Sequence, residues 1–333
     1  MNNFIFTCGD INGIGPEISL KCINKIYSPH KRKLFFICSS NVFEYYYKRL
    51  SLTFPFEVFN KFNQHSIDSP EVCIISPEKN KFLLGNPTYQ SGEASFIAIE
   101  TAYNILTNQL HGNGAMITAP ISKHAFELAG IKYPGHSEML AEWCGTEKFM
   151  MMFLSRKYKM GLVTIHEPIK KIASLLTRNR LKQSINVALK SLRSDFGITS
   201  PKIAVLGLNP HAGENGRIGM EEERVIKPII ASMIDQKLVG PFSPDAYFAT
   251  KMYRKYDLTL GMYHDQILIP FKMMSFDEGV NYTAGLPIIR TSPDHGTAFD
   301  IAGEMIAHPG SIISAFNFAE RILQNRKSFS IYG

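Results

Sequence analysis

The chain has 333 residues, of which 45% are hydrophobic and 20% are charged. This length can bury a large core and predicts two domains, and the composition is ordinary for a globular protein. No apolar run approaches the roughly 20 residues that span a bilayer, and the first residues lack the basic start and apolar core of a signal peptide. We therefore expect a cytoplasmic protein without a membrane partner.

The formal net charge is +7, which suits an anionic ligand. Basic residues do not cluster beyond short pieces such as HKRK at 30–33, so we do not expect a nucleic-acid partner. The five cysteines are dispersed and show no CxxC spacing. They are predicted to be free thiols rather than disulfides or ligands of a structural zinc ion.

Apolar runs of strand length alternate along the chain with longer segments of helical period. We expect strands at 3–7, 34–40, 72–76, 115–119, 149–154, 160–165, 202–208, 257–263 and 280–284. We expect helices from Pro16, over 91–110, from a Thr177 cap to about Phe196, and from about 297 to 325 with a break near Pro309. This alternation predicts an α/β fold with a largely parallel sheet and ligand loops at strand ends.

A glycine-rich loop, CGDINGIGPE at 8–17, follows the first expected strand. Its glycines do not match the GxGxxG fingerprint of dinucleotide-binding domains. Such a loop can hold an anion through its amide groups and the dipole of the next helix. It is equally compatible with a tight turn from strand to helix.

Three histidines follow expected strands: His166, His211 within GLNPHAGENGRIG, and His264. Neutral imidazole is a common ligand of divalent ions, and a catalytic metal often has three protein ligands with an open position for substrate. Sequence spacing does not show that the three converge. Each histidine alone could equally be a hydrogen-bonded loop residue.

Other loops carry basic and polar side chains of the kinds that hold phosphate and carboxylate groups. These are His136, Ser137, Lys272, Asn281 and Arg290. Any single one could be a solvated surface residue. Arg290 fits that description least, because it stands among glycine, proline and apolar residues rather than on a charged helix face.

Six segments taken together resemble the family of 4-hydroxythreonine-4-phosphate dehydrogenases of vitamin B6 biosynthesis. They are TCGDINGIGPE, TAPISK, YPGHSEMLAE, GLNPHAGENGRIG, MYHDQ and VNYTAGLPIIRTSPDHGTAFDIAG. The resemblance implies two α/β/α domains similar to the isocitrate and isopropylmalate dehydrogenases, with the active site in the interdomain cleft at a homodimer interface. We place the first domain at 1–130 and 285–333 and the second at 131–284.

The resemblance also assigns roles to the residues singled out above. It implies that His166, His211 and His264 bind a divalent ion (zinc, magnesium or cobalt), with the histidine at 264 supplied by the neighbouring subunit. The positions that match the family's substrate-binding residues are His136, Ser137, Lys272, Asn281 and Arg290. Asp245 matches a family aspartate near the metal, and we expect it to be the base or a neighbour of the metal, with Asp265 and Lys272 as alternatives.

The reaction implied is the oxidation, linked to NAD or NADP, of 4-phosphohydroxy-L-threonine to 2-amino-3-oxo-4-phosphobutanoate. This β-keto acid would then lose carbon dioxide to give 3-amino-2-oxopropyl phosphate. The divalent ion would stabilise the deprotonated form of the reacting hydroxyl. The sequence leaves open the choice between NAD and NADP and the residues that hold the nicotinamide.

Three places beside the expected site depart from the family pattern: Ser137 stands for threonine, Ile11-Asn12 for Pro-Ala, and Ile267 for glycine. They leave the substrate preference open. The main rival is a sister dehydrogenase of 4-phospho-threonate or 4-phospho-erythronate. An acyltransferase of related fold would not need three metal-binding histidines, and a descendant that only binds ligand would not need the intact set of ligands.

Overall fold

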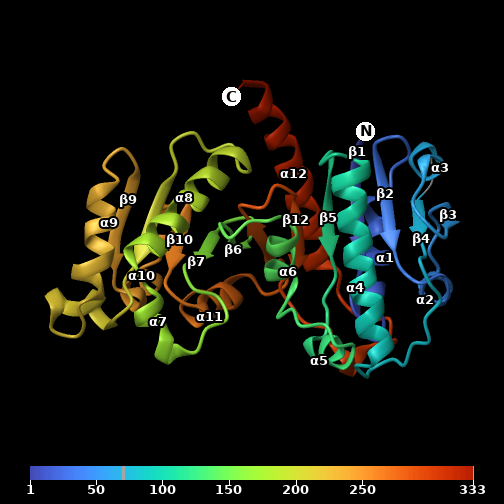
Figure 1. Ribbon diagram of the computed structural model, residues 1–333, viewed down its shortest axis with the longest axis horizontal. Coiled ribbons are helices and arrows are strands. Elements are labelled where there is room, and N and C mark those ends of the chain that lie inside the picture. Colours follow the sequence, from blue (N-terminus) through green and yellow to red (C-terminus); the bar gives the residue numbers. More distant parts are fainter. Residues whose placement is uncertain (70–71, 333) are drawn as a thin grey trace. The chain divides into compact units, whose positions relative to one another are not determined.

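The computed structural model describes residues 1–69 and 72–332, and the chain folds into two compact units (Figure 1). The first contains residues 1–143 and 287–323, and the second contains residues 144–286 and the C-terminal residues from Gln324 onward. The chain thus leaves the first unit after Trp143 and returns to it at Pro287. From the sequence we place these two crossings at 130 and 285.

The first unit is built on six parallel strands in the order β3-β4-β2-β1-β5-β12. They are β1 (Asn2–Thr7), β2 (Arg32–Ile37), β3 (Phe56–Phe59), β4 (Val72–Ile75), β5 (Gly114–Thr118) and β12 (Arg290–Pro293). Nearly every residue of β1, β2, β4 and β5 is buried, as expected for parallel strands covered on both faces.

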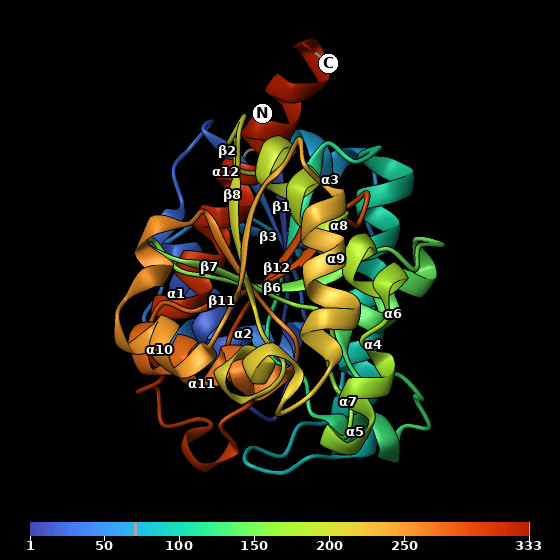
Figure 2. The ribbon, with the colours of Figure 1, turned by 90° about the vertical axis from the view of Figure 1, so that its left-hand side faces the viewer.

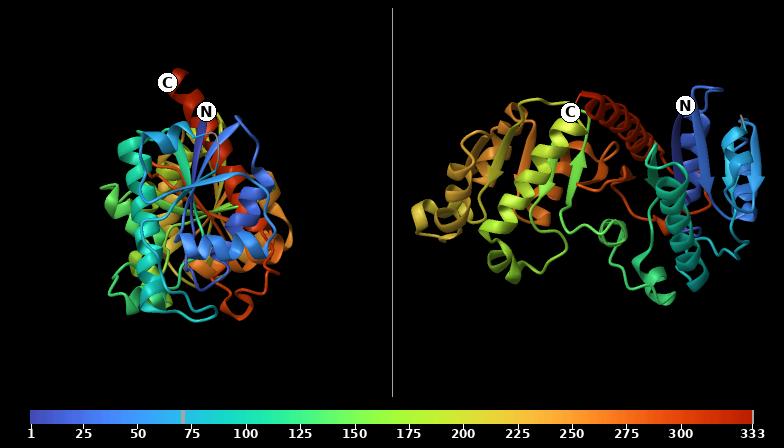
Figure 3. Two further views of the ribbon diagram at one scale, coloured as in Figure 1. Left: turned by 90° about the vertical axis from the view of Figure 1, so that its right-hand side faces the viewer. Right: turned by 45° about the horizontal axis from the view of Figure 1, so that its top comes forward.

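Helices pack on both faces of these strands, with α4 on one side and α1 on the other (Figure 3). The α-helices that begin in this unit are α1 (Gly15–Ile26), α2 (Ser40–Arg49), α3 (Gln64–Asp68), α4 (Tyr89–Asn104), α5 (Lys123–Leu128), α6 (His136–Trp143) and α12 (Gly310–Tyr332). A π-helical turn (Ile105–Gln109) extends α4, and a 3-10 turn (Phe299–Ile301) follows β12.

The second unit is built on six strands in the order β11-β6-β7-β10-β8-β9. They are β6 (Met150–Leu154), β7 (Lys159–Leu162), β8 (Lys202–Leu206), β9 (Lys237–Phe242), β10 (Leu258–Gly261) and β11 (Val280–Ala284). The pairs among β7, β10, β8 and β9 are parallel, whereas β6 runs antiparallel to both of its neighbours. The exception has a simple cause, because the connection from β6 to β7 is too short for the crossover that parallel strands need.

Figure 2 views this unit end on, with α8 and α9 on one face of the strands and α10 and α11 on the other. The α-helices are α7 (Ile169–Leu175), α8 (Arg178–Ser194), α9 (Lys227–Ser232), α10 (Pro244–Ala249) and α11 (His264–Ser275). Shorter helical turns cover Pro210–Gly216, Glu222–Ile226 and Met252–Lys255. Side chains of α11 such as Ile267 and Phe271 pack with Phe153 and Leu206 in one apolar core.

Most of the expected elements are confirmed. Thr177 caps α8 by accepting a hydrogen bond from the backbone of Arg180, and the five cysteines are free. The expected helix from 297 to 325 is wrong in its first half, since the long helix begins only at Gly310. Left-handed residues at 298, 303 and 305 interrupt the segment before it. Across residues 1–69 and 72–332, no helix has the length and apolar character that crossing a membrane requires.

The glycine-rich loop at 8–17 uses its polar side chains to hold neighbouring backbone. The carboxylate of Asp10 accepts hydrogen bonds from the amide of Asn12 (2.9 Å) and the hydroxyl of Ser91 (3.1 Å). The side chain of Asn12 accepts from the amide of Leu83 (2.7 Å) and donates to the carbonyl of Asn86 (2.7 Å). These contacts favour the interpretation of the loop as a structural turn.

Burial raises the pKa of Asp10 from its usual 3.8 to about 6. The folded chain therefore binds this proton more tightly than the unfolded chain does. The stabilisation is fully present below pH 3.8 and is lost as the pH rises through about 6. A difference of about two pKa units between the folded and unfolded chain corresponds to about 3 kcal/mol in the free energy of unfolding.

We expect Asp10→Asn to remove this pH dependence, because an amide keeps an acceptor for Asn12 but cannot ionise. Relative to the variant, the wild-type free energy of unfolding should fall by about 2 kcal/mol between pH about 4 and about 6.5. Urea unfolding across that pH range measures the free energy of unfolding, and the exposed Asp277→Asn is the control. A difference between wild type and Asp10→Asn that does not vary with pH would contradict the prediction.

Candidate active site

The three histidines singled out in the sequence follow three neighbouring parallel strands of the second unit. β10 lies between β7 and β8, with Gly261 opposite Leu162 and Leu260 opposite Val205. Parallel strands end at the same edge of a sheet, where ligands of α/β proteins bind. The loops of His166, His211 and His264 therefore start side by side.

Buried polar side chains tie these loops together. The Thr164 hydroxyl donates to the carbonyl of Met262 (2.6 Å), which joins the loop of His166 to that of His264. Gln266 accepts from the amide of Met262 (2.7 Å) and donates to the carbonyl of Gly207 (2.7 Å). The start of the His211 loop is thereby joined to the loop of His264.

His166 and His264 lie next to each other, with ring centroids 5.9 Å apart. Both line a cavity of about 350 Å³ together with Tyr263 and Asp265. Nδ1 of His264 is 2.7 Å from Oδ1 of Asp265. When Nδ1 carries the proton and donates to this carboxylate, the lone pair of Nε2 faces away from Asp265 and is available to a ligand.

His211 stands on an unusual turn. Residues 211–215 all have positive φ, between 42° and 78°. Gly213 is the only glycine among the five, and a left-handed helical conformation costs about 1–2 kcal/mol for each L-residue with a side chain. Strain of this kind clusters at functional sites when the surroundings hold it in place.

Asp245 lies at the start of α10. The pKa of its carboxyl is held below the usual range first by the hydroxyl of Ser243 (2.6 Å), then by the amide of Ala246, with a smaller contribution from the charge of His211. A carboxylate with a lowered pKa is ionised at neutral pH and is a weak base. The environment thus favours an electrostatic role for Asp245 over that of proton acceptor.

Two pairs of potential ligands thus stand at this edge, His166 with His264 and His211 near Asp245. Within the described part of a single chain, no three His, Cys, Asp or Glu side chains come close enough to hold a metal ion. Imidazole nitrogens suit zinc and similar divalent ions. The donors fit such an ion chemically, but the three predicted histidines do not form a complete set within one chain.

The first unit contains three buried side chains of the kinds that bind anions. Arg290 begins β12, and His136 and Ser137 begin α6; all three are buried. Nε of Arg290 donates to the hydroxyl of Thr118 at the end of β5 (2.9 Å). Burial lowers the pKa of Arg290 to about 9, so the guanidinium is still a cation at neutral pH. The negative charge of Glu138 acts in the opposite direction and raises the pKa of Arg290, as expected because a buried charge is costly unless it is paired.

His136 lies beside this cation. Its pKa is lowered well below the usual value by burial and by the charge of Arg290, so the ring is neutral at pH 7. Its Nε2 is buried and has no hydrogen-bond partner among the described residues. Buried polar atoms are normally paired, and a phosphate oxygen would satisfy this one.

The remaining predicted positions, Lys272 and Asn281, belong to the second unit. Lys272 is half-buried in the last turn of α11, and Asn281 lies on β11. Oδ1 of Asn281 is buried and lacks a hydrogen-bond partner among the described residues. It is therefore available to a polar ligand.

The helix that begins at His264 also exposes an apolar stripe. Ile269, Met273 and Phe276 follow helical spacing and are 58%, 83% and 68% exposed. Large apolar side chains grouped in this way mark interaction surfaces.

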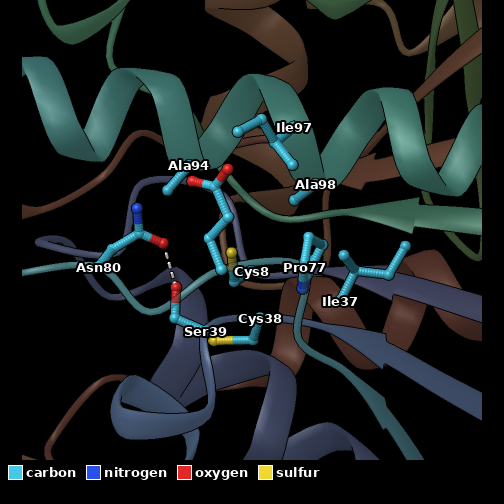
Figure 4. Close-up of a pocket in the computed structure, with 10 residues that line it drawn as sticks. Cys8, Ile37, Cys38, Ser39, Pro77, Asn80, Ala94, Ile97 and Ala98 are labelled. Atoms are coloured by element: carbon cyan, nitrogen blue, oxygen red, sulfur yellow. Dashed lines mark hydrogen bonds between the residues drawn. The ribbon is translucent and has the colours of Figure 1, made fainter. Parts of the chain in front are cut away.

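A cavity near the glycine-rich loop does not form a second candidate site (Figure 4). It measures about 10 Å³, which accommodates about one water molecule. Cys8 and Cys38 face it, and burial, together with the neighbouring Cys8, raises the pKa of the Cys38 thiol. Thiols in such surroundings are inert.

Four supporting residues were not predicted from the sequence: Thr118, Thr164, Gln266 and Glu222. Thr118 and Gln266 lie in or beside quoted motifs, TAPISK and MYHDQ, but nothing in those motifs reveals their contacts. Glu222 lies in a run of three glutamates, which is typical of a solvated surface.

The comparisons with known proteins agree with one another. The family model described as "Pyridoxal phosphate biosynthetic protein PdxA" matches residues 30–319. A 4-hydroxythreonine-4-phosphate dehydrogenase of Prosthecochloris aestuarii is 39% identical over 344 residues, covering 98% of each chain. One of Bacteroides thetaiotaomicron is 35% identical over 324 residues, covering 96% of this chain and 88% of the relative.

A solved structure also matches the chain. The crystal structure of 4-hydroxythreonine-4-phosphate dehydrogenase from Klebsiella pneumoniae has a TM-score of 0.82 at 34% identity. The match covers 97% of this chain and 100% of the other. The predicted α/β architecture is therefore confirmed.

The buried guanidinium leads to a prediction about anion binding. Inorganic phosphate should raise the Tm of the wild type, since it would compensate the charge of Arg290. Arg290→Met should have a lower Tm than the wild type, because Thr118 and the carboxylate of Glu138 lose their interaction with the guanidinium, but this Tm should not respond to phosphate. The exposed Arg156→Met is the control. Equal phosphate-dependent shifts in wild type and Arg290→Met would exclude the proposed anion site.

Proposed function

Because the chain belongs to the PdxA family of pyridoxal phosphate biosynthetic proteins, we propose that it is an oxidoreductase acting on 4-phosphohydroxy-L-threonine. It transfers a hydride to NAD or NADP and forms 2-amino-3-oxo-4-phosphobutanoate, which loses carbon dioxide to give 3-amino-2-oxopropyl phosphate. The observation that carries the proposal is the match to the 4-hydroxythreonine-4-phosphate dehydrogenase of Prosthecochloris aestuarii, which covers 98% of both chains.

The first unit supplies the phosphate site of the proposed enzyme. Arg290 provides the buried positive charge, neutral His136 provides a hydrogen bond through Nε2, and Ser137 provides a hydroxyl. Ser137 keeps the hydroxyl of the family's threonine, so the hydrogen bond to phosphate is retained. Lys272 on α11 and Asn281 on β11 remain proposed substrate-binding residues.

His166, His211 and His264 hold the divalent ion in this proposal. When bound, the ion supplies positive charge that lowers the pKa of the substrate hydroxyl, and the nicotinamide supplies the hydride acceptor. A set of imidazole nitrogens suits zinc or cobalt better than magnesium, which prefers oxygen ligands. Asp265 orients the ring of His264 through Nδ1, and Asp245 adds negative charge near His211.

Each site is completed by a second copy of the chain, which donates the partner's His264 to His166 and His211. Two observations support this arrangement. No three potential ligands gather within the described part of one chain, and α11, which begins at His264, exposes the apolar stripe of Ile269, Met273 and Phe276. Such a stripe is suited to a homodimer interface.

A nicotinamide-reduction assay of the purified protein tests the proposed reaction. We expect turnover with 4-phosphohydroxy-L-threonine, a much lower rate with 4-phospho-erythronate or 4-phospho-threonate, and loss of both rates with a chelator. His211→Ala should stay folded and lose bound metal and turnover, whereas the exposed His124→Ala should keep both. A higher rate with a sugar acid would establish the sister activity, and full activity of His211→Ala would exclude its role as a ligand.

Mixing two inactive variants tests whether the subunits share each site. A heterodimer of His264→Ala and His211→Ala regains one intact site, because one chain keeps His211 and its partner keeps His264. Random pairing of subunits should then restore about a quarter of the wild-type activity. The mixture should be refolded together before the assay, with each variant alone as control. No recovery in a mixture shown to contain heterodimers would mean that each site uses its own His264.

A further inference from the structure

We propose that Glu222 is the positioning residue of the His211 loop, holding residues 207–213 in the conformation that presents the imidazole. The significance of this for metal binding rests on the proposed function, in which His211 is a ligand. The structural part of the inference stands on contacts that do not involve any ligand.

The carboxylate of Glu222 is fully buried and binds the backbone where the loop leaves β8. Oε1 accepts hydrogen bonds from the amides of Leu208 (2.7 Å) and Asn209 (2.8 Å). Oε2 accepts from Nδ2 of Asn209 (2.9 Å). Hydrogen bonds to an ionised acceptor are stronger than neutral ones, and these pair amides that lie beyond the end of the strand.

Two glycines leave the space that this carboxylate occupies. A Cβ added at Gly207 would lie 3.1 Å from Oε1, and one at Gly213 would lie 2.6 Å from Oε2. Glu222 therefore packs against both the start and the middle of the loop. Any side chain at residue 213 would displace it.

Glu222 acts at the residue on which the left-handed turn of the loop closes. The left-handed turn is closed by the contact from the Ala212 amide to the Asn209 carbonyl (3.1 Å) and the longer one from Ile218 to Gly213 (3.2 Å). Asn209, on which the turn closes, is itself held by Glu222 through two hydrogen bonds. The geometry of His211 thus depends on a side chain from outside its loop.

The neighbouring glutamates show that this role is specific. Glu223 forms an ion pair with Lys227, and 31% of its side chain is exposed. Of the three loop donors that bind Glu222, Glu221 accepts a hydrogen bond only from Nδ2 of Asn209 (2.7 Å). Both oxygens of Glu222 are occupied by donors of the loop, so it acts through the backbone and does not touch a substrate.

Three variants separate the reach of this side chain from its charge. Glu222→Asp keeps the charge but is one methylene too short to reach both amides. Glu222→Gln keeps the acceptor at Oε1 and loses the one facing Asn209. Glu223→Gln makes the same chemical change on the half-buried neighbouring glutamate and is the matched control.

We expect hydrogen exchange at 207–219 to be fastest in Glu222→Asp, intermediate in Glu222→Gln, and unchanged in Glu223→Gln, with similar Tm in all. Affinity for Co²⁺, measured by titration calorimetry, should fall about 10- to 100-fold in Glu222→Asp and less in Glu222→Gln. Raising the Co²⁺ concentration should then restore turnover in both, which general destabilisation would not allow.

Unchanged exchange at 207–219 in both Glu222 variants would overturn the inference. A larger loss of Co²⁺ affinity in Glu222→Gln than in Glu222→Asp would also overturn it, because charge would then matter more than reach. If the wild type itself binds no Co²⁺, the proposed metal site fails. The exchange rates alone would then still decide whether Glu222 holds the loop.

Discussion

The parallel pairing of β7, β10 and β8 is the constraint on which the candidate site of the second unit depends. Because the three strands are neighbours and run in one direction, the loops that follow them start at one edge of the sheet. Sequence distance then matters little, and histidines almost a hundred residues apart come from adjacent loops. Thr164 and Gln266 convert this adjacency into fixed geometry by joining the loops through buried hydrogen bonds.

The two units contribute different chemistry, and burial explains the difference. Arg290 and His136 are buried in the first unit, where Arg290 stays a cation at neutral pH and His136 stays neutral. Such groups are suited to bind an anion tightly and without proton exchange. The histidines and Asp245 of the second unit are more exposed, as expected of groups that must meet a further ligand.

The sequence predicts the parts of the fold that depend on continuous apolar runs, such as β1, β2 and β5, which are buried on both faces. It misses β12, because the residues RTSP look like a polar loop, although all four are buried. β12 carries Arg290, for which we propose a role in binding the phosphate of the substrate. The long helix begins later than the sequence predicts, because apolar periodicity does not reveal the left-handed residues before it.

For the site, the sequence indicates which side chains carry chemistry but not which side chains hold them in place. His211 is conspicuous among glycines, but its loop alone leaves its role open, and the prediction that it binds a metal ion comes from the family resemblance. Glu222 is hidden in a run of three glutamates, where only the fold distinguishes the fully buried one from its half-buried neighbours. Positioning residues are harder to predict because their contacts are with backbone amides, which have no signature in the sequence.

The strained turn at 211–215 connects His211, the proposed ligand, with Glu222, the proposed positioning residue. A left-handed run of five residues is unfavourable by itself, so it persists only because buried contacts outside the turn offset its cost. The glycines at 207 and 213 serve this purpose less by their own flexibility than by leaving room for the carboxylate of Glu222. The contacts of Glu222 are made with the residues before His211 and not with its imidazole, which agrees with the proposal that this side chain binds a metal ion.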